Sequence, residues 1–479
     1  MENQEQTTKP AGRYLRIKPF AFLMLLFLVI LVTAGLTIFA LTFGEEKVVE
    51  VKVPVERQEF AQLYDAFDEL NTKYYKEVDK EKLVEGAVNG MVDALDDPYS
   101  DFMTKKEAQE FSESLSGSFQ GIGAEVQDSN GQIMIVSPIK NSPAERAGLL
   151  PNDIVLEVDG KNIEGKTTTE AVSLIRGEKG TEVKLLIKRG DAEPMTVTIK
   201  RDDIPIETVY GEMLDGGIGH IQITSFSETT SDELVAILDS LKDVKGIVLD
   251  MRQNPGGYLE QAYEIANLFL EDGKPIYQIE MRDGKPKVFK AKGPKAYDVP
   301  LTVLVDEGSA SASEIVAAAL QESAGAKVVG VQSFGKGTMQ TVEEYKDGSN
   351  LKYTQGKWLT PKGNWINEKG VTPDVEAKLP DYATLPYLDT KAEMKQGMVS
   401  EQVKAAKQML AALGYEPGET TTTFDEAMTS AVYTFQADNG LAQDGIVTGD
   451  TTKKLMEKLR DKLKTDDTQV KAAVDALKK

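Results

Sequence analysis

The fold is indicated most clearly by the segment Leu301-Thr-Val-Leu-Val-Asp-Glu-Gly-Ser-Ala-Ser-Ala-Ser-Glu314. Its first five residues form a short apolar run, which is typical of a buried strand, and Asp306-Glu-Gly308 ends that run. Good helix formers occupy 310–320. Ser311 is therefore predicted to lie at a strand-to-helix turn, where its hydroxyl is accessible and the amides of a helix N-terminus can face an anion.

The neighbouring sequence repeats this alternation of strand and helix. Gly246–Asp250 is another short apolar run, a turn rich in small residues follows at 251–257 (Met-Arg-Gln-Asn-Pro-Gly-Gly), and 259–270 has a helical pattern. A further apolar run lies at Lys327–Val331. Strands that alternate with helices predict an α/β core.

Lys336 lies on a glycine-flanked turn, in Ser333-Phe-Gly-Lys-Gly-Thr-Met-Gln340, 25 residues after Ser311. The chain has no cysteine and one histidine, so a cysteine nucleophile and zinc sites built from several histidines or thiolates are excluded. Lysine is then the strongest candidate for a base that activates a serine without a metal, and no cofactor is expected. Such a base must be neutral near pH 7, which requires a lowered pKa that burial can supply. The one histidine, His220, lies on a predicted strand and is interpreted as structural.

Residues 117–202 have a different pattern, in which short strands are separated by Gly, Asn and Asp turns and one helix lies at about 167–176. The predicted strands are Ile133–Val136, Ile154–Val158, Val183–Ile187 and Met195–Ile199. Two motifs narrow the interpretation: Phe119-Gln-Gly-Ile-Gly-Ala-Glu-Val126 and Ser142-Pro-Ala-Glu-Arg-Ala-Gly-Leu-Leu-Pro-Asn-Asp-Ile154. Together they resemble a PDZ domain, the first as its carboxylate-binding loop and the second as the turn before its next strand.

The resemblance implies that Gly121, Ile122, Gly123 and Ala124 bind the C-terminus of a peptide. The glycines allow backbone amides to converge on a terminal carboxylate, and the following strand pairs with an extended peptide. Arg176, at the end of the PDZ helix, either relays peptide binding to the active site or simply caps that helix.

Residues 20–43 read FAFLMLLFLVILVTAGLTIFALTF and contain no charge. A membrane-spanning helix needs roughly 20 apolar residues, whereas the apolar region of a signal peptide has roughly 7–15. Basic residues precede the segment and acidic residues follow it: Lys9, Arg13, Arg16 and Lys18, then Glu45, Glu46 and Glu50. The positive-inside rule predicts a single-pass anchor, with 1–19 in the cytoplasm and the catalytic part outside. The alternative is a long cleaved signal peptide, which the lack of a small-x-small site disfavours.

Amphipathic helices are predicted on both sides of the central domains. Within 45–116, apolar side chains recur at helical spacing at Phe60, Leu63, Tyr64, Phe67, Leu70 and Tyr74, which indicates core or dimer packing. Residues 393–460 resemble a small three-helix peptidoglycan-binding domain, which either binds the cell wall or makes a protein contact. A charged helix is predicted at 461–479. Together, the terminal regions predict a homodimer.

Length and charge limit the class of protein. At about 100–200 residues per domain, 479 residues correspond to three or so domains. The net charge is −22, from 55 basic and 77 acidic residues. Because phosphate binding needs a basic face, this charge argues against nucleic acid as a partner.

The motifs around Ser311 and Lys336, with the PDZ domain, resemble the C-terminal processing (tail-specific) peptidases over roughly 55–385. These are serine proteases with a Ser-Lys catalytic pair. The resemblance implies a crotonase-like α/β protease core at 203–385, with Ser311 as nucleophile, Lys336 as base and Gln340 orienting the lysine. It also implies an oxyanion hole made by the amide of Ala312 with that of Gly256 or Gly257.

Over its whole length the chain resembles the processing proteases of Gram-positive endospore formers. This implies protein substrates recognised by their C-terminal tails, and a role in signalling or sporulation. The PDZ domain is expected either to deliver substrate or to block the active site until a peptide binds. The competing class is a non-catalytic PDZ scaffold at the cell wall, which would keep the strands but lose Ser311 or Lys336.

Overall fold

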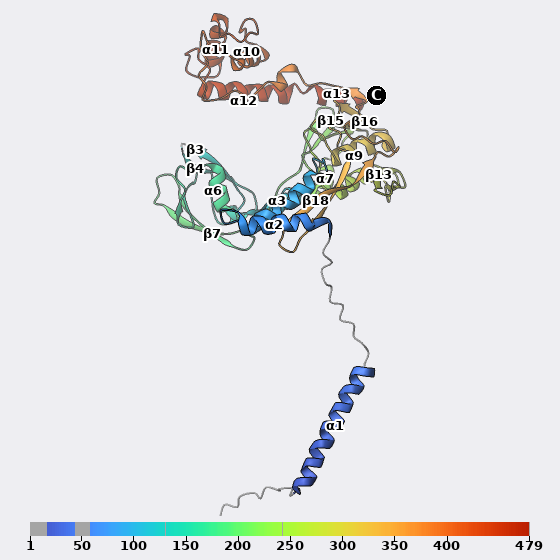
Figure 1. The fold of residues 1–479 in the computed structure, drawn as a ribbon. Helices are drawn as coiled ribbons and strands as arrows, with labels where there is room; N and C mark the ends of the chain where they lie inside the picture. Colours follow the sequence, from blue (N-terminus) through green and yellow to red (C-terminus); the bar gives the residue numbers. More distant parts are fainter. Residues whose placement is uncertain (1–16, 44–57, 130, 242, 479) are drawn as a thin grey trace, which may run out of the picture. The chain divides into compact units, whose positions relative to one another are not determined.

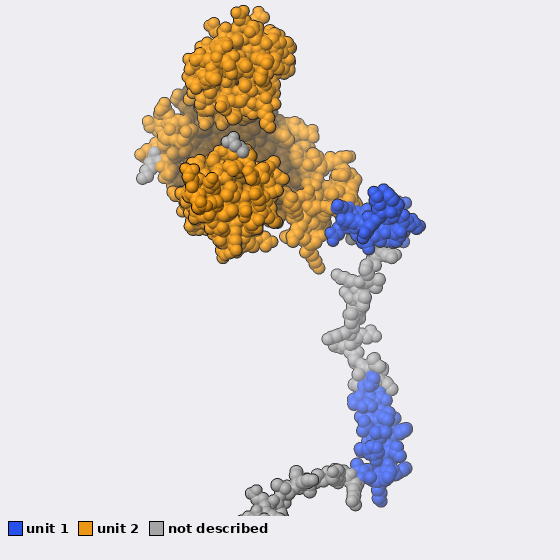
Figure 2. All heavy atoms as spheres, turned by 90° about the vertical axis from the view of Figure 1, so that its left-hand side faces the viewer, with its two compact units in different colours: residues 1–83 blue, residues 84–479 orange. Residues whose placement is uncertain are grey.

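A computed structural model describes residues 17–43, 58–129, 131–241 and 243–478 (Figure 1). The chain divides into two units, residues 1–83 and 84–479, which Figure 2 colours separately and which are described here one at a time. The first unit contains helix α1 (Pro19–Phe43), the short 3-10 helix η1 (Gln58–Phe60) and α2 (Ala61–Lys73).

Helix α1 is, among the described residues, the one helix that is long and apolar enough to cross a membrane, judged by length and composition. Of the flanking charges that predicted its orientation, Lys18 is described. The others lie outside the described residues: Lys9, Arg13, Arg16, Glu45, Glu46 and Glu50.

Helix α2 carries the predicted apolar stripe, and none of its residues is buried. Leu63 and Tyr64 are 41% and 56% exposed. Helix α3 (Lys80–Asp93) follows and has one buried residue, Val92. Helix α2 is therefore where the periodicity predicts a helix, but its apolar stripe does not form a core among the described residues.

The segment that resembles a PDZ domain folds as an antiparallel sheet with strand order β3-β4-β5-β7-β8, and β6 pairs with β5. Its strands are β3 (Ala124–Ser129), β4 (Gln132–Pro138), β5 (Ile154–Val158), β6 (Lys161–Asn162), β7 (Glu182–Lys188) and β8 (Met195–Lys200). The helices are α5 (Pro143–Arg146) and α6 (Thr168–Ile175). All four predicted strands and the predicted helix are present. At the two ends of the segment, β2 (Ser118–Gly121) pairs with β9 (Asp202–Pro205).

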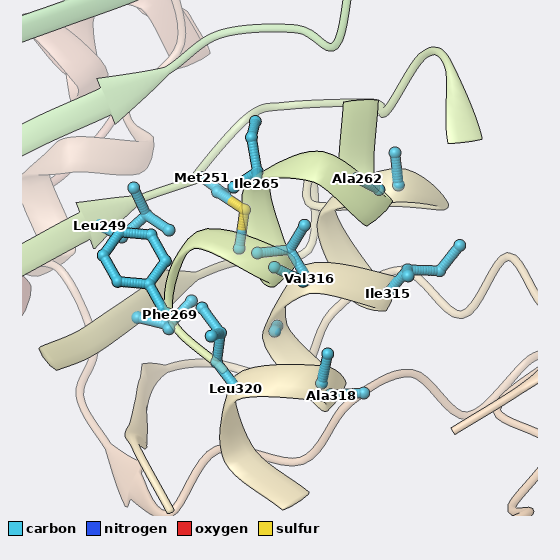
Figure 3. Packing of buried hydrophobic residues seen from close by; sticks show 14 of the residues in the cluster. Leu249, Met251, Ala262, Ile265, Phe269, Ile315, Val316, Ala318 and Leu320 are labelled. Atoms are coloured by element: carbon cyan, nitrogen blue, oxygen red, sulfur yellow. The ribbon is translucent and has the colours of Figure 1, made fainter. Parts of the chain in front are cut away.

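The α/β core is built on a six-stranded sheet of order β10-β11-β12-β15-β16-β19, in which β10 is antiparallel and the other strands are parallel. The strands are β10 (Val209–Leu214), β11 (Ile218–Ile223), β12 (Gly246–Asp250), β15 (Leu301–Val305), β16 (Lys327–Gly330) and β19 (Val375–Glu376). Helices α7 (Thr230–Ser240), α8 (Leu259–Leu268) and α9 (Ala312–Ala319) belong to the same core. Figure 3 shows side chains of α8 and α9 packed together with Leu249 and Met251, which are fully buried. The α/β prediction is correct, and the turns after β12 and β15 leave the same edge of the sheet.

The core contains a second, five-stranded sheet. It contains β1 (Asp101–Met103), β13 (Pro275–Met281), β14 (Pro286–Lys290), β17 (Thr338–Glu344) and β18 (Asn350–Leu359). Strand β18 pairs with β1, β13 and β17. Helix α4 (Lys105–Ser116) connects β1 to β2 and begins with a capping box between Thr104 and Glu107.

The C-terminal region contains α10 (Glu401–Ala412), α11 (Glu426–Asp438) and α12 (Gly449–Thr465), whose buried residues form one apolar cluster. The prediction of one charged helix from residue 461 is wrong. Helix α12 continues to Thr465, and a separate helix, α13 (Thr468–Ala476), packs its buried Ala473 against Val248, Leu304 and Val329 of the six-stranded sheet. The physical reason is an apolar face on α13, made by Val470, Ala473, Val474 and Leu477.

Candidate active site

Ser311 lies at the turn between β15 and α9, as predicted. Its backbone has φ +56° and ψ −112°, a conformation that L-residues seldom adopt. Strain of this kind costs on the order of 1–3 kcal/mol and persists where the surrounding structure fixes it. Helix α9, which starts at the next residue, is buried along its entire length. The serine is therefore held at the helix N-terminus by a rigid support.

The buried carboxylate of Glu314 connects the two predicted catalytic residues. It accepts hydrogen bonds from the backbone amides of Ser311 (2.8 Å) and Lys336 (2.9 Å). It also accepts from the Gly335 amide and the Ser333 hydroxyl, both at 2.6 Å. Since charge-assisted bonds are among the stronger hydrogen bonds, one side chain fixes both loops. The prediction from sequence missed this residue.

The turn that carries Lys336 passes very close to another loop. A Cβ atom on Gly337 would lie 2.8 Å from the Asn367 amide, and one on Gly335, whose φ is +89°, would lie 2.8 Å from the Lys369 amide. Glycine is therefore required on both sides of the lysine. The Lys336 carbonyl also accepts a bond of 2.8 Å from the Trp358 indole.

The Lys336 ammonium lies 4.9 Å from the centre of the Tyr99 ring, and within the described part of the chain no hydrogen bond joins it to the Ser311 hydroxyl. Burial lowers the pKa of Lys336, and the positive charge of Lys352 lowers it further. The carboxylates of Glu314 and Asp97 act in the opposite direction, and the net pKa is below the ordinary lysine value. This is the direction that a general base requires.

Gln340 does not contact Lys336 through a hydrogen bond in the described structure. Its side-chain amide donates to the hydroxyls of Thr338 and Thr354, both at 3.0 Å. Thr354 is also bound by the Asp97 carboxylate, which acts on Lys336 electrostatically. Any orienting effect of Gln340 on the lysine therefore passes through intermediate residues.

The turn 251–257 brings its glycines next to the serine. A Cβ atom on Gly256 would lie 2.9 Å from the Ser311 Cβ and 3.1 Å from the Ala312 amide nitrogen. The Gly256 amide donates to the Asn254 side chain at 2.9 Å. Gly257 forms a parallel bridge with Phe226, so its own amide points away from that residue. The structure therefore brings Gly256 next to Ser311 and Ala312, and Gly257 follows Gly256 in the chain.

The two PDZ motifs are bonded to each other. Gly123, with φ +74°, accepts a 2.8 Å bond from the Ser142 hydroxyl, and a Cβ atom at this glycine would overlap Ser142. The Ile122 carbonyl accepts a 2.8 Å bond from the Ala144 amide. The second motif thus fixes the conformation of the glycine loop.

A groove of about 230 Å³ lies beside that loop, between β3 and α6. Its lining includes Phe119, Ile122, Gly123, Ala124, Val126, Val172, Ile175 and Arg176. The Arg176 guanidinium lies 4.8 Å from the Phe119 ring centre and forms an ion pair of 4.0 Å with Glu113 of α4. Arg176 therefore connects this groove to helix α4, which follows β1 of the second sheet.

His220 lies on β11 and belongs to a charge network that extends from the buried Asp250 to the exposed Glu212. Its ring nitrogens bond the carboxylates of Asp250 (3.0 Å) and Glu212 (3.1 Å), and Arg252 bonds Asp250 at 2.6 Å. Among the described residues, no group of three or more His, Cys, Asp or Glu side chains is placed to hold a metal ion.

Three residues near Lys336 were not identified from the sequence: Asp97, Tyr99 and Glu314. Asp97-Pro98 appears in sequence only as a helix stop, and nothing local shows that the chain folds back onto a lysine 239 positions later. Glu314 carries a weak signal, because a glutamate three residues after a serine at a helix start fits a capping box. The contact with Lys336, however, is a tertiary one.

Family models match four parts of the chain. Residues 217–377 match peptidase family S41, and 134–189 match a PDZ domain. Residues 39–107 match the activating protease CtpB N-terminal domain, and 399–455 match a peptidoglycan binding domain.

Relatives match the chain over nearly its full length. The carboxy-terminal processing protease CtpA of Bacillus subtilis is 48% identical over 460 residues, which cover 95% of this chain and 98% of the relative. A CtpA-like serine protease of Staphylococcus haemolyticus is 39% identical over 482 residues, covering 100% and 97%. Among solved structures, the photosystem II D1 C-terminal processing protease is 27% identical with a TM-score of 0.41, covering 67% of this chain and 88% of that one.

Proposed function

Since the chain belongs to peptidase family S41, as a carboxy-terminal processing serine protease with a PDZ domain, we propose that Ser311 is its nucleophile and Lys336 its general base. Gln340 supports the lysine through Thr354. The amides of Ala312 and Gly257 form the oxyanion hole, because the Gly256 amide is already bonded to Asn254.

In this mechanism, neutral Lys336 accepts the Ser311 proton while Oγ bonds to the carbonyl carbon of the scissile peptide. The carbonyl oxygen becomes an oxyanion, which the two amides stabilise. The C–N bond then breaks, and the Lys336 ammonium protonates the leaving amine. Water attacks the resulting ester with Lys336 again as base, which releases the acid and restores Ser311.

The observation that carries this proposal is the Glu314 bridge, because it fixes the backbone of the nucleophile and of the base to one buried carboxylate. A base acts on a nucleophile only within hydrogen-bond reach, so a device that sets their relative position is expected. The lowered pKa of Lys336 supports the same roles.

The proposal is tested by degradation of casein, an unfolded substrate, with residues 45–479. Ser311→Ala and Lys336→Ala should each abolish cleavage while leaving the unfolding temperature nearly unchanged, because nucleophile and base act as a unit. EDTA should not inhibit. Cleavage by either variant would overturn the assignment.

The PDZ groove, in this proposal, binds the free C-terminal tails of protein substrates and gates the active site. Gly121, Ile122, Gly123 and Ala124 supply the backbone that receives the carboxylate. The apolar lining of the groove favours an apolar terminal residue. Arg176 relays occupancy of the groove through its ion pair with Glu113.

The proposed location is the cell membrane, with the N-terminus in the cytoplasm and the catalytic part outside. The length and composition of α1 and the match to a peptidoglycan binding domain support this placement. The C-terminal module binds peptidoglycan or contributes to a homodimer. The physiological role is proteolysis in signalling or sporulation, and mass spectrometry of peptides retained by Ser311→Ala would identify substrates.

A further inference from the structure

We propose that a second lysine, Lys352, is a positioning residue that keeps Lys336 in its neutral, proton-accepting form, and that Phe111 of α4 holds Lys352 in place. The inference rests on the proposed role of Lys336 as base. It concerns how one strand of the second sheet prepares that base before substrate arrives.

The strand register brings Lys352 to the catalytic loop. Strands β17 and β18 are antiparallel, with Gln340 opposite Thr354 and Val342 opposite Lys352. Because residues two apart on a strand project from the same face, Lys352 shares a face with Thr354. Thr354 is the residue that receives the Gln340 side chain, and its backbone amide donates to Ser100 at 3.1 Å.

The hydrogen bond from Thr354 to Ser100 fixes the segment 97–100, which contacts Lys336 through Tyr99. Ser100 follows Tyr99, whose ring lies 4.9 Å from the Lys336 ammonium. Asp97, in the same segment, bonds the Ser100 hydroxyl at 2.6 Å. Lys352 is thus two positions along β18 from Thr354, the residue that binds the segment 97–100.

An aromatic ring, rather than a carboxylate, holds the Lys352 ammonium. It lies 5.1 Å from the centre of the Phe111 ring, and it enters no ion pair among the described residues. Asp101 of β1 lies opposite Lys352 in the strand register, and Asp101 is exposed. A ring face attracts a cation without neutralising its charge, so the positive charge of Lys352 still acts on its neighbours.

The charges around Lys336 come from four elements. Glu314 of α9 and Asp97, before β1, favour the ammonium form, and Lys352 of β18 opposes it. Tyr99 contributes its ring, and Glu368, from the loop that bonds Gly335, acts on Tyr99. The two carboxylates raise the pKa of Lys336, and burial lowers it. Lys352 is the charged side chain that lowers this pKa together with burial.

The test compares Lys352→Met with Lys352→Arg, which keeps the charge, and with Lys287→Met. Lys287 is a matched control, since its ammonium lies 5.0 Å from the Phe289 ring on β14, an edge strand that pairs with β13. In the full chain carrying Ser311→Ala, the rate of Lys336 acetylation by acetic anhydride is followed against pH by mass spectrometry. This readout reports the protonation of Lys336 without requiring activity.

Lys352→Met should move the labelling profile of Lys336 to higher pH. With Ser311 present, it should lower kcat/KM about threefold to tenfold near pH 7, with recovery at higher pH, because the base is then more often protonated. Lys352→Arg and Lys287→Met should match the parent. Phe111→Leu should shift the profile in the same direction by a smaller amount, which provides a test if Lys352→Met does not fold.

An unchanged labelling profile in folded Lys352→Met, or equal shifts in the Met and Arg variants, would overturn the inference. If Lys352→Met shifts the labelling profile but Lys336→Ala still cleaves casein, the proposed role of Lys336 as base is refuted. The inference that Lys352 acts on Lys336 would then still stand.

Discussion

The guanidinium of Arg252 bonds the carboxylate of Asp467 at 2.8 Å, although 215 residues separate them in the chain. Arg252 also bonds Asp250 and the Gln469 side chain. Since Arg252 belongs to the turn that contains Gly256 and Gly257, the start of α13 supports the proposed oxyanion turn from the far end of the sequence. This polar contact adds to the apolar packing of α13 on the sheet.

Ala473→Asp should therefore destabilise the core. It places a carboxylate against Val248, Leu304 and Val329, and we expect the free energy of unfolding to fall by about 2–4 kcal/mol. Denaturant unfolding measures this change. Lys471→Ala, on the exposed face of the same helix, should change it by less than about 0.5 kcal/mol. Equal effects would show that α13 does not depend on its apolar face.

Glu314→Gln should reduce kcat by about a hundredfold or more with little change in KM. The amide has a single acceptor oxygen, and its NH2 group would face the Gly335 amide, which is also a donor. It cannot accept from the Ser311, Lys336 and Gly335 amides together, so the two loops lose their common anchor. Cleavage of a fluorogenic peptide measures the loss. Glu307→Gln, an exposed glutamate in the turn after β15, is the control. Near-normal activity of the Glu314 variant would contradict the anchoring role.

His220 predicts a pH dependence of stability. Burial lowers its pKa, but hydrogen bonds to Asp250 and Glu212 outweigh burial and leave the pKa above 6.5 in the folded protein. A raised pKa means that the contribution of His220 to stability is complete below pH 6.5 and is lost as pH rises through the folded-state pKa. The thermal unfolding temperature of the parent protein should fall as the pH rises from 6.5 through the folded-state pKa of His220. The same pH change should lower the unfolding temperature of His220→Gln by less.

The same histidine is directly observable, because it is the only one in the chain. Its single imidazole resonance should titrate above 6.5. Titration at or below that value would contradict the network. His220→Gln should also retain most proteolytic activity, which would distinguish His220 from the proposed catalytic pair, Ser311 and Lys336.

Peptides with a free, apolar C-terminus should raise the turnover of a separate reporter substrate, and amidated peptides should not. Binding in the groove beside Gly123 shifts the enzyme only if the bound and free states differ in activity. Arg176→Ala should weaken the response to peptide while leaving basal turnover. Deletion of 118–202 should leave activity that no longer responds. Equal effects of free and amidated peptides would show that the glycine loop does not read a carboxylate.

The apolar stripe of α2 predicts self-association. Exposed stripes of this kind tend to be covered by a partner, and the proposed attachment to one membrane would raise the effective concentration of two copies. Light scattering on residues 45–479 should show a dimer, and Leu63→Glu should dissociate it. A strictly monomeric protein at micromolar concentration would contradict this prediction.

Much of the core was predictable because its signals are local. The apolar runs at Gly246–Asp250 and Leu301–Val305 form strands with those same bounds, and Ser311 lies at the predicted turn. The environment of Lys336 was not predictable, since Tyr99 and Glu314 reach it through tertiary contacts with no sequence periodicity. The end of the chain was misread because the many charges of 461–479 obscured the apolar positions of α13, among them Val470, Ala473 and Val474.

The docking of α13 has a consequence during synthesis. A nascent chain that has emerged as far as Gln340 already contains Ser311 and Lys336, yet the sheet face around Val248 stays uncovered until more than a hundred further residues follow. The bond from Arg252 to Asp467 likewise waits for that segment. The order of translation therefore delays the last contacts made by the turn that contains Gly256 and Gly257 until the end of the chain has emerged.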